Sequence, residues 1–260
     1  MIKFFRKIRK RLLTENKFSK YLLYASGEII LVVLGILIAL SLNNWKEELA
    51  NQGEEQRILR GLKHEFELNI AEVNRNIKLN TATRESTIAL IHLIRSDNPF
   101  DDSRNIDSLL NAVYMFGSFD AQTGIVDEVI SSGKLSIIQD SELRDRLTSA
   151  SGLLDNLEED YIIRSNFYMD HIIPFLSKYV ALVNQDQFMD FSSWSDTYKK
   201  NELAVSPFSQ RYEEIDLLQF ENLIATHKLS NDFVTLDESD LKTFFMSTLE
   251  IINRNLETDE

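Results

Sequence analysis

The sequence predicts a mainly α-helical protein, in which a single N-terminal transmembrane helix continues into a helical stalk and an all-α, bundle-like extracytoplasmic domain. An uncharged apolar run lies near the N-terminus, and the 260 residues include only three prolines and eight glycines, which favours helices over sheets. Beyond the run, apolar residues recur at steps of three and four, the spacing of one helix face. We divide the chain into a basic segment (1–20), a transmembrane helix (21–45), a stalk helix (46–80) and a helical domain (81–260).

The basic segment, residues 1–20, is amphipathic. Apolar residues alternate there with lysines and arginines, a composition typical of helices that lie on a membrane surface. Anionic lipid attracts such a cluster, and because the cluster adjoins the apolar run we interpret it as a membrane contact and expect no nucleic-acid partner. The residues expected to contact anionic lipid are Lys3, Arg6, Lys7, Arg9, Lys10 and Arg11.

The transmembrane helix, residues 21–45, must contain a charged residue. Its uncharged stretch, 29–42, is shorter than the roughly 20 residues that a bilayer requires, so the span takes in Glu28 as well. A carboxylate within hydrocarbon is costly unless it is neutral or partnered. Two interpretations stay open: Glu28 lies at a locally thinned boundary, or it contacts a polar group on a partner helix. Gly35 and Ala39 have the spacing of small residues that lets two helices approach closely.

The flanking charges predict the orientation of the span. Eight basic and two acidic residues precede residue 46, whereas 20 basic and 39 acidic residues follow it. The positive-inside rule therefore puts the N-terminus in the cytoplasm and the bulk of the chain outside. We expect Tyr21 and Tyr24 at the inner membrane interface and Trp45 at the outer one. The alternative is a signal peptide cleaved at the small-x-small sequence 39–41.

The stalk helix, residues 46–80, has an apolar stripe with polar residues between its members. Gly53 is a point where this helix could break. The stripe could pack against the chain's own domain or against a second copy. Asn69 and Asn76 interrupt one possible heptad pattern, which argues against a long coiled coil.

The domain at 81–260 reads as a series of shorter helices. Asp140 or Ser141 is expected to cap one of them, and Pro174 to kink or end it. Residues 119–124 and 131–133 read as turns. Residues 184–201 have no assignment. The expected helices are 81–95, 106–116, 125–130, a long one from 141, 212–228, and a last one capped by Asp237.

Four segments can be compared with known proteins. They are M-I-K-F-F-R-K-I-R, Y-A-S-G-E-I-I-L-V-V-L-G-I-L-I-A-L, N-N-W-K-E-E, and S-S-G-K-L-S-I-I-Q-D-S-E-L-R at Ser131–Arg144. In these segments the chain resembles a family of uncharacterised single-pass membrane proteins of Gram-negative bacteria, whose domain has no known function. The resemblance implies an inner-membrane protein with a cytoplasmic N-terminus and a helical periplasmic region, and it implies no activity.

The sequence predicts no catalytic, cofactor or metal site. It contains no cysteine, which excludes disulfides and thiol catalysis. The segment from His64 resembles a helical zinc motif, but Leu68 occupies the place of the second histidine. Ser131–Lys134 fails as a phosphate loop because Glu128 stands where the motif needs glycine.

Two classes of function fit these observations. The first is a non-enzymatic, membrane-anchored module that scaffolds or regulates a protein partner, or self-associates. The second is an envelope ligand sensor or an enzyme with an unrecognised site, since aromatic residues could line a cavity in the bundle, although core packing explains them more simply. These aromatic residues are Tyr161, Phe167, Tyr168, Phe175, Phe188 and Trp194.

Overall fold

The computed structural model describes residues 18–101, 106–189, 197, 203–208 and 210–257. All regular structure in these ranges is helical, which confirms the mainly α class. The chain divides into two compact units, Met1–Arg57 and Ile58–Glu260. The long helix α2 (Phe18–Ile94) supplies residues to both units.

The first unit contains the apolar part of α2. Its most apolar 18-residue window has a mean hydropathy of 2.4, and none of this window is buried within the protein. By length and composition it is the one helix among the described residues that could cross a membrane. The helix continues without interruption through Gly53, so the possible break there does not occur.

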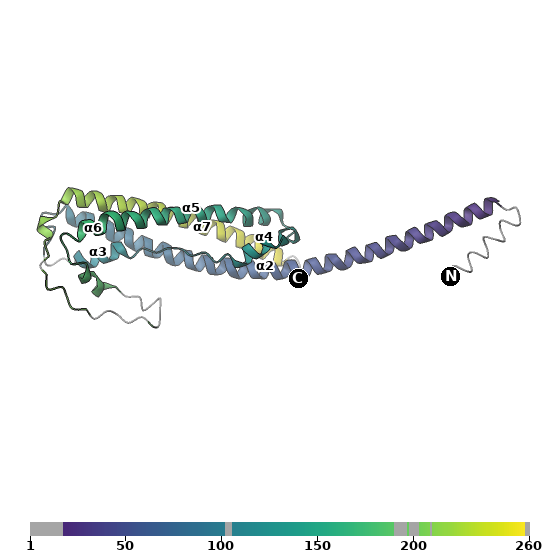
Figure 1. Ribbon diagram of the computed structural model, residues 1–260, viewed down its shortest axis with the longest axis horizontal. Coiled ribbons are helices and arrows are strands. Elements are labelled where there is room, and N and C mark those ends of the chain that lie inside the picture. Colours follow the sequence, from purple (N-terminus) through teal and green to yellow (C-terminus); the bar gives the residue numbers. More distant parts are fainter. Residues whose placement is uncertain (1–17, 102–105, 190–196, 198–202, 209, 258–260) are drawn as a thin grey trace. The chain divides into compact units, whose positions relative to one another are not determined.

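The second unit is built on three long helices, α2, α5 (Ser141–Phe167) and α7 (Leu217–Glu257), which lie side by side in Figure 1. Along the contacts between α5 and α7, residue numbers rise on one helix as they fall on the other, so these helices are antiparallel. The contacts between α2 and α7 show the same opposite order, so this pair is antiparallel too. Helices α2 and α5 are therefore parallel. The α5–α7 contacts are Asp140 with Arg254, Arg146 with Ser247, Asn156 with Asp237, and Arg164 with Asn231. The α2–α7 contacts are Asn80 with Glu238, Arg84 with Asp232, and Arg95 with Glu221.

The three helices pack through heptad-spaced positions. Buried residues on α2 and α7 alternate in steps of three and four, as in helices that pack lengthwise. On α7 they are Phe220, Ile224, His227, Asn231, Val234, Glu238, Leu241, Phe245, Thr248 and Ile252. On α2 they are Leu59, Leu62, Phe66, Asn69, Val73, Asn76, Asn80, Thr83, Thr87, Leu90 and Ile94. Asn69 and Asn76 thus belong to the heptad pattern, and the expectation that they interrupt it is wrong.

Buried polar residues separate two apolar clusters along the bundle. One cluster extends from Ile58 to Val73 on α2 and includes Leu147 of α5 and Phe245 of α7. The other contains Leu90 of α2 and lies at the opposite end of the bundle. The stripe of the expected stalk therefore packs against its own domain from Ile58 onward, which settles one of the alternatives left open above.

Two expected helix boundaries are wrong. The helices expected at 46–80 and 81–95 form one helix, α2, which ends at Ile94. Those expected at 212–228 and from residue 237 form one helix, α7, which begins at Leu217. Asp237 lies inside α7 and accepts a hydrogen bond from Asn156, so it caps nothing. In both helices the polar run that reads as a break contains buried residues whose hydrogen bonds are made inside the bundle.

Several short elements agree with expectation. Helices α3 (Ile106–Tyr114) and α4 (Gly124–Ser131) lie close to the expected positions. Gly133 has a φ of 74°, the left-handed conformation that glycine adopts readily, and ends α4 before the 3₁₀ turn η1 (Lys134–Ile137). Two further 3₁₀ turns, η3 (Leu182–Phe188) and η4 (Tyr212–Glu214), precede α7.

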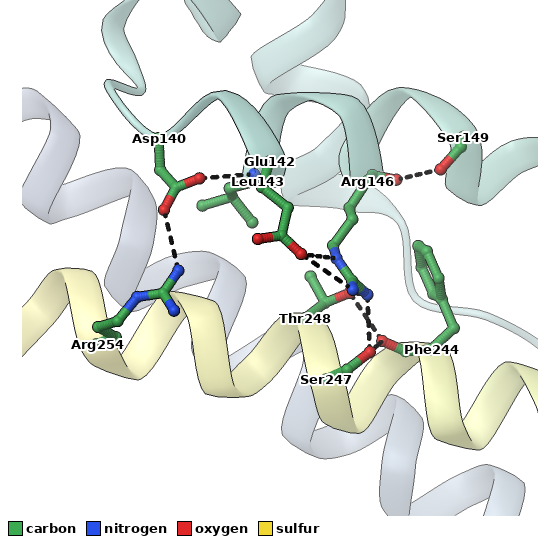
Figure 2. A network of polar contacts seen from close by, with 9 residues as sticks. All are labelled: Asp140, Glu142, Leu143, Arg146, Ser149, Phe244, Ser247, Thr248 and Arg254. Carbon is green, nitrogen blue, oxygen red and sulfur yellow. Dashed lines mark hydrogen bonds and ion pairs between the residues drawn. The ribbon is translucent and has the colours of Figure 1, made fainter.

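A polar clip joins the start of α5 to the end of α7 (Figure 2). Asp140 caps α5, as expected, by accepting a hydrogen bond from the backbone N–H of Leu143 at 3.0 Å. The same carboxylate contacts Arg254 at 3.4 Å. Arg146 donates to Ser247 at 2.7 Å and lies over the ring of Phe244.

Helix α5 ends in a π turn, η2 (Tyr168–Ile172), which is followed by α6 (Ile173–Leu176). Arg164, Tyr168 and Ile172 are buried at two successive steps of four residues, where a heptad has one step of three and one of four. The π turn therefore adds one residue to the repeat. Pro174 lies in the first turn of α6, where its missing N–H costs little, and the helix stops at Leu176.

Candidate functional site

An extended segment, Met115–Thr123, joins α3 to α4, and we call it the strap. The Met115 carbonyl accepts a hydrogen bond from Thr83, and the Ile125 N–H donates one to Glu65. Thr83 and Glu65 are 18 residues apart on α2, or about 27 Å. The ten steps from Met115 to Ile125 must therefore cover about 2.7 Å each, roughly four-fifths of the span of a fully extended chain and well above the rise of about 1.5 Å in an α-helix. The expected turn at 119–124 is wrong for this reason.

Asparagine side chains of α2 bond the strap backbone. Asn69 donates to the Gln122 carbonyl and accepts from the Gln122 N–H, both at 2.8 Å. Asn76 donates to the carbonyl of Ser118 at 2.8 Å. A carboxamide supplies both a donor and an acceptor, so these residues give the strap the partners that a neighbouring strand would otherwise provide.

Arg164 lies beneath the strap and is 1% exposed. Its guanidinium donates to the side-chain oxygens of Asn80 at 3.0 Å and Asn231 at 2.9 Å, and to the Gly117 carbonyl. Its guanidinium carbon is 4.4 Å from the centroid of the Phe116 ring. Burial lowers the pKa of Arg164 to about 10, so the group remains charged at neutral pH.

Glu238 is the acidic counterpart of Arg164 and is fully buried. It accepts hydrogen bonds from Asn80 at 2.9 and 3.0 Å and from the Tyr161 hydroxyl at 2.6 Å. Burial raises the pKa of Glu238, whereas the bonds from Tyr161 and Asn80 oppose the rise. Among the described residues Arg164 and Glu238 form no direct ion pair; Asn80 bonds to both.

Tyr161 connects this network to the strap. Its hydroxyl donates to Glu238 and accepts a hydrogen bond from the Phe119 N–H at 2.9 Å. Burial, followed by the charge of Glu238, raises the pKa of Tyr161, so the hydroxyl keeps its proton. The network therefore fixes α2, α5, α7 and the strap to one another.

His227 lies at the end of the network and is fully buried. Its Nε2 is 3.2 Å from the Val113 carbonyl, so that nitrogen carries the proton. Burial lowers the pKa of His227 to about 4, and the charge of Arg164 acts in the same direction. The imidazole is therefore neutral at physiological pH.

A groove of about 420 Å³ opens between the strap and α5. Its volume lies in the range of ligand sites, roughly 300–1,000 Å³. The exposed carboxylates of Asp120 and Glu158 line it, and no basic side chain does. The lining residues are Ser118, Phe119, Asp120, Ala121, Leu154, Leu157, Glu158, Tyr161 and Ile162.

A family model described as "Family of unknown function (DUF6090)" matches residues 28–174. The chain belongs to this family. The DUF6090 match contains the strap, Asn80, Tyr161 and Arg164, and it ends before α7, which supplies Glu238. No curated protein and no solved structure matches the chain.

The titratable residues of the network are enclosed by the helices of this DUF6090 chain. Arg164, Glu238 and His227 are buried, with their hydrogen bonds directed into the bundle. An acid or base in catalysis must come within hydrogen-bond reach of its substrate. In the described part of the chain, no three metal-binding side chains gather in one place.

Most of the sequence-predicted site residues lie on the first unit. Gly35, Ala39 and Trp45 are exposed on α2, and Glu28 is partly exposed. Their roles at an interface stay predictions. Tyr21 and Tyr24, expected at the inner membrane interface, belong to α2, but their side chains are outside the described part of the structure. The lipid-contact residues lie outside the described residues: Lys3, Arg6, Lys7, Arg9, Lys10 and Arg11.

The aromatic residues considered as cavity lining divide into three groups. Tyr168 and Phe175 are core residues of the second cluster, and Phe167 packs against them. Tyr161 alone among them lines the groove between the strap and α5. Phe188 is partly buried, and Trp194 lies outside the described residues.

Sequence reasoning missed the buried network. Asn80, Asn231 and Glu238 read as surface residues because they are polar, and Arg164 reads so because it is charged. The available signal was phase, and it was clear at two positions. Glu238 lies between the core residues Val234 and Leu241, and Arg164 lies three residues after Tyr161 and four before Tyr168.

Proposed function

We propose that this DUF6090 protein is a single-span anchor of the bacterial inner membrane that carries a helical, non-enzymatic binding module. In this proposal the N-terminus is cytoplasmic and the second unit lies in the periplasm, where it scaffolds or regulates a protein partner or self-associates. The observation that carries the proposal is the exposed 18-residue window of α2 with its mean hydropathy of 2.4. An exposed surface of this kind requires lipid or protein around it.

The charge distribution supports the orientation. The residues before position 46 are net basic, and those after it are net acidic by 19 charges. A protease added to spheroplasts should remove a C-terminal tag and leave an N-terminal tag intact. Digestion of the N-terminal tag alone would contradict the proposed topology.

Glu28, Gly35 and Ala39 are the proposed contact residues within the span. A partner helix could approach closely at Gly35 and Ala39 and offer a polar group to Glu28. We expect a stoichiometric partner or a homo-oligomer when the full chain is purified in mild detergent and its mass is measured by light scattering. Gly35→Ile should weaken that assembly, whereas Ile36→Leu, its control, should not. A purified chain that is monomeric and without any partner would refute the binding role.

A further inference from the structure

We propose that the groove between the strap and α5 binds an extended, basic segment of a partner protein, which pairs with the strap backbone as an added strand. This inference rests on the proposed function, because it locates the contact through which the module would hold its partner. The unpaired backbone of the strap, the volume of the groove and its charge support it.

The backbone of the strap is bonded at both ends and open in the middle. Gly117 and Gln122 bond to side chains of α2, and the N–H of Phe119 bonds to Tyr161. Between these points, the carbonyl of Phe119 and both backbone groups of Asp120 and Ala121 make no hydrogen bond to any described residue. Unpaired N–H and C=O groups along an extended chain form a template for another strand.

The groove beside this open edge can accept side chains. Leu154, Leu157 and Ile162 of α5 provide apolar walls, and Phe119 provides one from the strap. In an added strand, side chains alternate between two faces, so every second residue of the segment would point toward α5. The volume of about 420 Å³ leaves room for side chains of such a segment.

The charge of the groove selects a basic occupant. Asp120 and Glu158 are its only charged lining residues, and both are exposed. Glu158 makes no ion pair with a described residue, and Arg75, whose charge interacts with Asp120, is already bonded to Glu72. A lysine or arginine beside an apolar residue would complement this surface.

The test uses the full chain in nanodiscs and a phage library of random peptides of about 12 residues, longer than a typical strand. Empty nanodiscs remove lipid-binding phage. We expect the recovered peptides to alternate apolar residues with lysine or arginine. A synthetic peptide from this set should lose about tenfold in affinity for Glu158→Lys and change little for Glu159→Lys. Glu159 is the matched control because it is an exposed neighbour on α5 that does not line the groove.

A second measurement isolates backbone pairing. N-methylation of alternate residues in the peptide should abolish binding in one phase and preserve it in the other, because only one phase of N–H groups faces the strap. Equal affinity for Glu158→Lys and Glu159→Lys, insensitivity to N-methylation in both phases, or recovery of no peptide would overturn the inference. Binding of small organic amines with no peptide recovered would also overturn it.

The complex from native membranes separates the two proposals. If the wild-type chain has a partner and Glu158→Lys retains it fully, the groove is not the contact but the binding role stands. If the wild-type chain is monomeric and without a partner, the binding role itself fails.

Discussion

Removal of the Arg164 guanidinium should destabilise the helical unit more than any exposed arginine does. Arg164→Ala takes donors from Asn231 and from the Gly117 carbonyl, and it leaves the buried charge of Glu238 without a nearby cation. Breaking a buried charge network by removing one partner typically costs about 3–5 kcal/mol. We therefore expect the free energy of unfolding to fall by about this amount.

Arg84→Ala is the matched control. Arg84 also joins α2 to α7, through an ion pair with Asp232 at 3.0 Å, but its side chain is 46% exposed. Such a pair contributes about 1 kcal/mol or less. Urea unfolding of the full chain, followed by circular dichroism at increasing denaturant, measures both variants. A loss for Arg164→Ala no larger than that for Arg84→Ala would refute the view that the network holds the bundle together.

Three further predictions concern single residues of the helical unit. Gly117→Ala should lower the free energy of unfolding by about 1–3 kcal/mol, because the new Cβ would lie 2.5 Å from the Asn76 side-chain oxygen. Gly152→Ala, on the exposed face of α5, should raise it by about 0.5–1 kcal/mol. A change of the same sign for both variants in urea unfolding would contradict this. Because the pKa of His227 is lowered to about 4, the unfolded state takes up the proton first as pH falls below about 6.5, and this group should remove about 2 kcal/mol of stability between pH 7 and pH 5. Glu238, with its raised pKa, acts in the opposite direction, so unfolding of His227→Gln at both pH values isolates the histidine, and an unchanged pH dependence would count against it. Asp140→Ala should lower the free energy of unfolding by about 1 kcal/mol, because it removes the cap on α5. Asp145→Ala, on the same helix but without a capping role, should change it little. Equal losses for the two variants would argue against the capping role of Asp140.

The sequence predicts the helices well where their core is apolar. The stripe that contains Leu62, Phe66 and Val73 has the spacing of three and four residues that the structure shows, and Asp140 and Gly133 mark real helix ends. Local rules suffice at these points because the cause, a cap or an apolar face, lies within a few residues.

The middle of the bundle could not be predicted in the same way. Asn80 and Glu238 are 158 residues apart, and each supplies hydrogen bonds that the buried side chain of the other requires. A pattern search that treats polar residues as exposed therefore divides α2 and α7 where the structure has one continuous helix. The extended strap was missed for a related reason, since its backbone partners are asparagine side chains from another segment.

The uneven placement of buried charge has a consequence for how the rods assemble. If α7 slid along α2 by seven residues in one direction, Asn231 would take the place of Glu238 opposite Asn80, and the carboxylate would move into the apolar layer of Phe245. In the other direction Phe245 would lie opposite Asn80 and leave its donors without an acceptor. Polar groups at such positions are known to fix the alignment of paired helices at some expense of stability. The buried network can thus hold α2, α5 and α7 in one axial register. A force along one of these helices would then be transmitted to the other two without a change of register.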